Sequence, residues 1–296
     1  MIISGNLLIF LLIRLTCALS FSACVSNDVS ITDVIPFHLE KPDAIFKLPH
    51  ELDEISGLTP LDSFHVAAIQ DEAGTLYVLN VKTGKVVDSV KFAGRGDYEG
   101  VERIGSQLFV LRSDGDLFTF NANRTSWGKR IKSERIRTRL SRRYDTEGLA
   151  YDPVSGTVYI VCKEYAGKKV RRSRAVFGFD VQNKRVSEKP LFLISSDSLS
   201  VLLADKQFRH SRFKPSAIAV QPNSGNLFLL SSPNRLLIVL NKDGQILAVK
   251  KLKKRIVRQP EGIAFMPDGS LIIASEGAGG RAVLVKYSML ISEKES

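Results

Sequence analysis

The sequence predicts an all-β protein folded as a five-bladed β-propeller, with antiparallel blades around a central channel. One pattern recurs five times in the 296 residues: a carboxylate or serine, a small residue, an aliphatic run, a turn and a second aliphatic run. Three of the four intervals between copies are about 45 residues, the length of one blade. The copies begin at Ser56, Glu99, Glu147, Ser216 and Glu261. With 44% hydrophobic residues, the chain is also too apolar to be disordered.

The third copy shows how strands follow one another within a blade. Residues 148–151 form the expected innermost strand, 157–161 the second and 176–180 the third, each separated by turn residues. The fourth and fifth copies repeat this order. Their second and third strands are expected at 226–231, 236–241, 270–275 and 282–287. Alternation and turn chemistry agree in these copies, so the prediction of blades does not depend on a single segment.

A propeller has to close, and the last copy ends after its third strand near Tyr287. Residues 44–48 have a strand pattern and are expected to supply the missing outer strand, which joins the two ends of the chain. Six blades are the alternative, because the long third interval leaves residues 190–213 unassigned. Within that interval, residues 198–204 favour a short helix or a lid loop.

The beginning of the chain predicts export. An apolar run interrupted by Arg14 leads to Phe21-Ser22-Ala23-Cys24, which is similar to the site where bacterial lipoproteins are cleaved and acylated. We expect a signal peptide over 1–23, a tether over 24–43 lipidated at Cys24, a propeller over 44–288 and a polar tail over 289–296. This places the protein in the bacterial cell envelope as a membrane-anchored lipoprotein. An ordinary cleaved signal is the alternative. Cys162 has no expected partner and is predicted to be a buried thiol.

Carboxylates recur where innermost strands begin and second strands end. Because these strands are antiparallel, both positions lie at the same rim of the channel. Several carboxylates this close together need a cation or a cationic partner, and oxygen ligands without His or Cys suit Ca²⁺, with Mg²⁺ as the alternative. The candidate metal ligands are Glu99, Glu147 and Glu261, with Glu54, Asp71 and Glu276 beside them. A structural role, in which each glutamate accepts backbone N–H groups, is the competing interpretation.

Taken together, these segments resemble the SdiA-regulated family of bacterial envelope proteins. The resemblance covers about residues 46–288. It is carried by Glu54-Ile55-Ser56-Gly57-Leu58, Gln70-Asp71-Glu72-Ala73-Gly74, Asp97-Tyr98-Glu99-Gly100, Asp145-Thr146-Glu147-Gly148-Leu149, Lys214-Pro215-Ser216-Ala217-Ile218, Gln259-Pro260-Glu261-Gly262-Ile263 and Ser275-Glu276-Gly277. The resemblance implies a five-bladed propeller with a bound calcium ion and no established catalytic activity.

The net charge of +11 is concentrated in three basic runs, within 129–143, 168–174 and 250–258. These connections are expected on the acidic rim, so the sequence predicts a basic collar around an acidic centre. The collar residues are Arg142, Arg143, Lys168, Arg171, Arg172, Arg174, Lys254 and Arg255. Such a collar suits anionic envelope ligands, namely lipid headgroups, lipopolysaccharide phosphates or acidic glycans. Solvated loops are the alternative. Nucleic acid is disfavoured, because the chain carries an export signal and its aromatic residues follow core periods.

Two functions are compatible with the sequence. The favoured one is a non-catalytic binding module at the cell envelope. The alternative is a metal-dependent hydrolase, lactonase- or phosphoesterase-like, which needs an open metal position and a general base. Glu164 or Asp114 is the candidate base, since no histidine is expected near the rim motifs.

Overall fold

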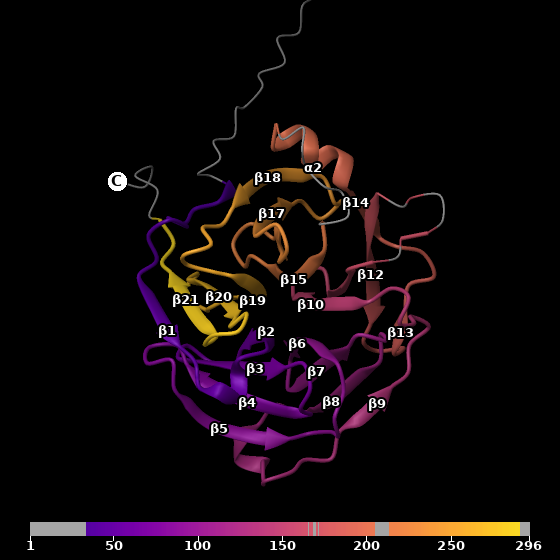
Figure 1. Ribbon diagram of the computed structural model, residues 1–296. Coiled ribbons are helices and arrows are strands. Elements are labelled where there is room, and N and C mark those ends of the chain that lie inside the picture. The colour runs from indigo at the N-terminus through magenta and orange to yellow at the C-terminus, as the bar shows by residue number, and fades with distance from the viewer. Residues whose placement is uncertain (1–33, 165, 168–169, 171, 205–212, 291–296) are drawn as a thin grey trace, which may run out of the picture.

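The computed structural model describes residues 34–290, except 165, 168–169, 171 and 205–212. Five antiparallel sheets stand around one central axis (Figure 1), as the sequence predicts. The innermost strands are β2 (Ile55–Pro60), β6 (Tyr98–Ile104), β10 (Thr146–Asp152), β15 (Pro215–Val220) and β19 (Gln259–Phe265). We number the blades 1 to 5 in this order.

Each blade continues outward from its innermost strand. The second strands are β3 (His65–Gln70), β7 (Gln107–Arg112), β11 (Thr157–Cys162), β16 (Leu227–Ser231) and β20 (Leu271–Glu276). The third strands are β4 (Thr75–Asn80), β8 (Leu117–Asn121), β12 (Ser173–Asp180), β17 (Leu236–Leu240) and β21 (Val283–Tyr287). The outer strands of blades 1 to 4 are β5 (Val86–Lys91), β9 (Glu134–Ile136), β13 (Arg185–Val186) and β18 (Ile246–Lys251). Two short 3₁₀ helices, η1 (His50–Leu52) and η2 (Arg124–Ser126), lie in the connections.

The ends of the propeller meet in blade 5. Its outer strand is β1 (Ala44–Lys47), which pairs antiparallel with β21 from Ala44 opposite Lys286 to Lys47 opposite Val283. The predicted closure by the N-terminal strand is therefore confirmed. It ties residues more than 230 positions apart into one sheet, as the register requires.

The long third interval adds a strand and a helix to blade 3. β14 (Phe192–Ser195) pairs with the first half of β12, beside β13, and α2 (Ser196–Leu202) follows it. The hydroxyl of Ser195 caps this helix by accepting a hydrogen bond from the backbone N–H of Ser198. The predicted short helix is thus present. Among the described residues there is no sixth sheet, and residues 205–212 lie outside the description.

The N-terminal segment packs on the propeller before β1 begins. Val34, Ile35, Phe37 and Leu39 are buried in the core between blades 4 and 5, where the ring of Phe37 contacts Phe228 and Phe265. Residue Phe37 also bridges to Met289 in the predicted polar tail. The expectation of a free tether up to residue 43 is therefore corrected for its described part, residues 34–43. Its apolar side chains gain more by burial than by solvation.

Every innermost strand has the same irregularity near its start. The pairing with the second strand skips one residue in each blade, which is the mark of a β-bulge. The bulged residues are Ser56, Glu99, Glu147, Ser216 and Glu261, the five that begin the sequence repeat. A glycine follows four of these five residues, all but Ser216, and allows neighbouring blades to approach: a Cβ on Gly100 would lie 3.0 Å from the backbone nitrogen of Leu149. The same holds for Gly148, where a Cβ would lie 3.0 Å from the nitrogen of Ile218.

The apolar core is divided among the interfaces of adjacent blades, with clusters that each draw on two neighbouring sheets. Cys162 is buried in one of them, as predicted, and burial raises the pKa of its thiol to about 12. Such a thiol is inert at neutral pH. In the part of the chain that the structure describes, no helix is long and apolar enough to span a membrane.

Candidate functional site

The acidic site lies at the mouth of the channel where innermost strands begin and second strands end. The structure brings together all six carboxylates that the sequence singled out. Asp71 interacts electrostatically with Glu54 and Glu276, and Glu276 in turn with Glu261. The series continues from Glu261 to Glu147 and from Glu147 to Glu99. We call these six residues the acidic mouth: Glu54, Asp71, Glu99, Glu147, Glu261 and Glu276.

The bulges explain how these side chains reach the mouth. A bulge rotates one residue out of the alternation that would place it between sheets, so Glu99, Glu147 and Glu261 are aimed away from the core. The serines at the same place act differently. The hydroxyl of Ser56 donates to the carbonyl of Tyr98 (2.6 Å) and that of Ser216 to the carbonyl of Pro260 (2.7 Å). Each serine thereby joins its blade to the next.

A lysine that the sequence analysis did not select lies among the glutamates. Lys163 follows β11, and its Nζ lies 2.6 Å from Oε1 of Glu147 and 3.8 Å from Oδ2 of Asp145. It also interacts electrostatically with Glu99, Glu261 and Glu276. Although burial opposes the shift, contact with Glu147 raises the pKa of Lys163. Its position at the end of a second strand, where other blades place acids, was the available signal.

Because the acidic mouth is buried, ionising all of its carboxyl groups is energetically unfavourable. Desolvation and then the charge of Glu147 raise the pKa of Glu99 to about 11, helped by a hydrogen bond with Asp97. Desolvation raises the pKa of Glu147 to about 8 even though Lys163 opposes the shift. Desolvation also raises the pKa of Glu261 to about 7. These glutamates therefore hold protons more tightly than free glutamate does.

The half of the acidic mouth that is formed by Asp71, Glu54 and Glu276 contains a carboxylate oxygen without a hydrogen-bond partner. Oδ1 of Asp71 is buried and has no hydrogen-bond partner among the described residues. Desolvation, followed by the charges of Glu54 and Glu276, raises the pKa of Asp71 to about 6. A pocket of about 460 Å³ borders this half and is lined by Glu54, Glu276, Asp53 and His50, among others. Buried carboxylate oxygens normally have a partner, so this atom marks a place for a donor or a cation.

Comparison with known proteins identifies the chain. Residues 47–278 match the SdiA-regulated family. The chain belongs to the SdiA-regulated family. Two solved structures share its architecture: a luciferin-regenerating enzyme (13% identity, TM-score 0.51, 84% of this chain and 96% of that one) and the PQQ-bound aldose sugar dehydrogenase from Streptomyces coelicolor (11%, 0.50, 84% and 99%). At these identities the likeness concerns the fold alone. No curated protein matches in sequence.

The calcium ion implied by the SdiA-regulated resemblance fits only part of the mouth. Among the described residues, no group of three or more His, Cys, Asp or Glu side chains is arranged to hold a metal ion. At Glu147, the ammonium of Lys163 already supplies the positive charge. At Asp71, by contrast, the charges of Glu54 and Glu276 oppose ionisation and one buried carboxylate oxygen has no partner, although Arg281 lines the pocket beside Glu54 and Glu276. Carboxylate oxygens are the donors that a hard cation prefers, so this half suits Ca²⁺ by its chemistry but has no preformed ligand set.

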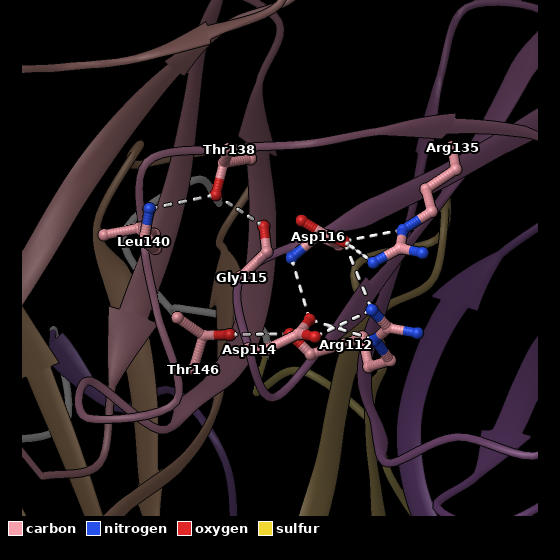
Figure 2. A network of polar contacts seen from close by, with 8 residues as sticks. All are labelled: Arg112, Asp114, Gly115, Asp116, Arg135, Thr138, Leu140 and Thr146. Atoms are coloured by element: carbon pink, nitrogen blue, oxygen red, sulfur yellow. Dashed lines mark hydrogen bonds and ion pairs between the residues drawn. The ribbon is translucent and has the colours of Figure 1, made fainter.

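Of the bases considered for a hydrolase, Asp114 and Glu164 are both ion-paired in this SdiA-regulated propeller. Asp114 receives two hydrogen bonds from the guanidinium of Arg112, of 2.9 and 2.7 Å. Figure 2 shows this pair within a network that also includes Asp116 and Arg135. Although burial opposes the shift, the bond from Arg112 lowers the pKa of Asp114. Glu164 pairs with Lys214.

The expectation that no histidine lies near the rim is wrong. His50, in η1, lines the same pocket as Glu54 and Glu276, and its Nδ1 lies 2.7 Å from Oδ2 of Asp53. The sequence did not show this, because η1 precedes the repeat and reaches the mouth only when blade 5 closes. Its side chain is 77% exposed.

The predicted basic collar is only partly present at the surface. Arg142, Arg143, Lys254 and Arg255 are exposed, and Arg172 pairs with Asp197. Arg174 does not belong to a surface collar, because it is 5% exposed and its guanidinium lies over the ring of Phe213. The reason is that β14 pairs with β12 at this point and covers it. Lys168 and Arg171 lie outside the described residues.

The opposite end of the channel contains another carboxylate that sequence reasoning missed. Glu102, in β6, accepts hydrogen bonds from the hydroxyl of Thr59 (2.6 Å) and from the backbone N–H groups of Arg103 (2.8 Å) and Tyr151 (3.3 Å). Desolvation raises its pKa to about 7. These partners link blades 1, 2 and 3, so Glu102 fits a structural role.

Proposed function

We propose that this SdiA-regulated propeller is a non-catalytic binding module, exported and lipid-anchored at the cell envelope, whose acidic mouth binds Ca²⁺. The observation that carries the proposal is the unpartnered, buried Oδ1 of Asp71 between Glu54 and Glu276. These three residues would hold the ion, with Mg²⁺ as the alternative. A bound Ca²⁺ would offset two of the three negative charges of these crowded carboxylates and offer remaining coordination positions to an anionic ligand.

The position of Lys163 supports different roles for the two halves of the acidic mouth. Its ammonium pairs directly with Glu147, at 2.6 Å, whereas no ion pair reaches Asp71 from the described residues. A cation bound there would reduce the remaining repulsion among the carboxylates of the acidic mouth. The ion pair also argues that Glu147, although predicted as a metal ligand, is the partner of Lys163, while Glu99 and Glu261 interact with the lysine only electrostatically.

Calcium should stabilise the folded protein in a concentration-dependent way. An ion that binds only the native state adds about 2.7 kcal/mol to the free energy of unfolding at 100 times its dissociation constant. The measurement is the thermal unfolding midpoint across a Ca²⁺ titration. Asp71→Asn should abolish the gain, because a neutral amide is a weaker ligand.

Asp243→Asn is the matched control, since Asp243 is an exposed aspartate in the turn between β17 and β18, at the other rim. It should retain the full response. Unfolding that is insensitive to Ca²⁺ and to chelator in the unmodified chain would show that the mouth binds no such ion.

The alternative function is a metal-dependent hydrolase. The pair formed by His50 and Asp53 favours it, because a carboxylate at 2.7 Å orients an imidazole at the edge of the acidic pocket. Three features support binding over hydrolysis. The imidazole is 77% exposed, and the two bases expected from the sequence, Asp114 and Glu164, are held by Arg112 and Lys214.

Anchoring at the membrane is proposed from Phe21-Ser22-Ala23-Cys24, which lies outside the described residues. If Cys24 carries lipid, Cys24→Ser should move most of the protein from the membrane to the soluble fraction, because a serine cannot form the thioether. Cell fractionation with immunoblotting measures this. Cys162→Ser, at a buried thiol far along the chain, is the control and should stay with the membrane. Equal membrane retention of the Cys24 variant and the unmodified chain would contradict lipidation.

A further inference from the structure

We call the pocket of about 460 Å³ that Glu54 and Glu276 line the acidic pocket. A second pocket lies directly beside it, on the other side of the connection between β20 and β21. Its volume is about 410 Å³. Its wall combines the outer strand of blade 5 with the connection that arrives from blade 4. The charged residues that line it are Lys47, Arg255, Arg258, Arg281 and Glu276. Four cations against one carboxylate make this pocket electropositive, although Glu276 belongs to the acidic mouth.

Three of the four cationic side chains have no ion-pair partner among the described residues. Lys47, Arg255 and Arg258 are exposed, and none forms an ion pair with a residue that the structure describes. Arg281 is fixed differently, with its Nε donating to the carbonyl of Leu48 at 2.8 Å and lying 3.7 Å from Oδ1 of Asp53. The pocket therefore has one oriented guanidinium and three exposed cationic side chains lining the same space.

The acidic and basic pockets share a wall. Glu276, Gly280 and Arg281 line both of them. Gly280 closes the turn, with its N–H donating to the carbonyl of Gly277 at 2.9 Å. A Cβ on Gly277 would lie 2.1 Å from the oxygen of Gly280, so the tight turn that forms this wall requires glycine there. An anion bound in the basic pocket and a cation bound in the acidic pocket would attract each other across this wall, so each would strengthen the binding of the other.

The geometry points to a phosphate-binding pocket formed by Lys47, Arg255, Arg258 and Arg281. Guanidinium groups bind phosphate oxygens in pairs, and the volume accommodates a phosphate ester with a small substituent. This inference rests on the proposed function, because it names the anionic group that the binding module takes up beside its cation. The ligand chemistry is that of a phosphate monoester or diester, either free in solution or in a lipid headgroup.

The position of the N-terminal segment bears on the source of the phosphate. Glu40 pairs with Lys253, in the same connection as Arg255 and Arg258, at 2.6 Å. The ten or so residues between Cys24 and Val34 can extend at most about 35 Å. A lipid at Cys24 would thus keep this side of the propeller within reach of phospholipid headgroups.

The test uses the full chain and two probes, inorganic phosphate and a soluble short-chain anionic phospholipid, with affinity measured by calorimetric titration at low salt. Binding of at least one probe should weaken by tenfold or more in Arg255→Gln/Arg258→Gln. The matched control is Lys85→Gln/Arg185→Gln, which removes the same charge at the other rim, where β5 and β13 begin. This control should bind as the unmodified chain does.

Every outcome of this experiment either supports the phosphate-binding pocket or overturns it. Binding of inorganic phosphate that the arginine variant loses supports a site for free phosphate groups. Binding of the phospholipid alone, lost in the same variant, supports a headgroup site. Absence of binding for both probes, or equal weakening by the control variant, overturns the pocket. The Ca²⁺-dependent rise in melting temperature serves as the separate readout. It should persist in Arg255→Gln/Arg258→Gln, so failure of this pocket is distinguished from failure of the acidic mouth.

Discussion

Lys163→Met should destabilise the protein by roughly 3 kcal/mol at pH 9, where Glu147 is ionised beside its lysine. The substitution leaves Glu147, whose side chain is 3% exposed, without the ammonium that lies 2.6 Å away. Removing one partner of a buried ion pair costs about 3–5 kcal/mol, and the lower end applies because the lysine is 32% exposed. Urea unfolding followed by circular dichroism measures the change in the free energy of unfolding.

The control for this substitution is Lys184→Met. Lys184 also lies 2.6 Å from its partner, Glu134, but both side chains are about half exposed. Exposed pairs contribute at most about 1 kcal/mol, so the control should be nearly neutral. Glu147→Gln added to Lys163→Met should recover most of the lost stability, because the unpaired charge is then gone. Equal effects of Lys163→Met and Lys184→Met would show that Lys163 is not the counter-ion of the mouth.

In the absence of divalent ions, the protein should be more stable at pH 5 than at pH 8. Glutamates and Asp71 of the mouth have raised pKa values in the folded state, about 6 for Asp71 and about 7 for Glu261, because burial and like charges oppose ionisation. A group with a raised native pKa binds its proton more tightly in the folded state. Its stabilising contribution is therefore complete below the unfolded pKa, near 4, and is lost as the pH rises through the native value.

These pKa values set the pH range of the effect. The free energy of unfolding should fall between about pH 5 and pH 8. Glu261 alone contributes on the order of 3 kcal/mol, from a pKa that moves from 4.5 to about 7 because the carboxyl is buried. Groups whose pKa is lowered, such as Asp114 and Asp152, are ionised throughout this window and affect only more acidic conditions.

Denaturant unfolding at pH 5, 6.5 and 8 measures the slope. Glu261→Gln should flatten it, because an amide does not titrate, whereas Glu188→Gln, at a glutamate that is 88% exposed, should leave it unchanged. Saturating Ca²⁺ should also flatten the slope, since an ion at Asp71 favours the ionised mouth. Stability that rises from pH 5 to pH 8 without divalent ions would contradict the assignment of raised pKa values to these residues.

Much of the site was predictable because the repeat and the topology are linked. Antiparallel pairing returns the end of every second strand to the rim where the innermost strand starts, so Glu99, Glu147 and Glu261 were expected to gather without any coordinates. Spacing likewise predicted five blades and the closing strand at residues 44–48. These conclusions depend only on local alternation and on chain order, which the sequence contains directly.

The sequence by itself determined the propeller, its closure by β1 and the convergence of six carboxylates on one mouth. Tertiary structure alone decided how those charges are balanced. It placed Lys163 against Glu147 and His50 beside Glu54, buried Arg174 under β14, and left Oδ1 of Asp71 unpartnered. The physical reason is that periodicity specifies which strand a residue occupies, whereas charge pairing depends on side-chain contacts of a few ångströms between blades that are far apart in the chain.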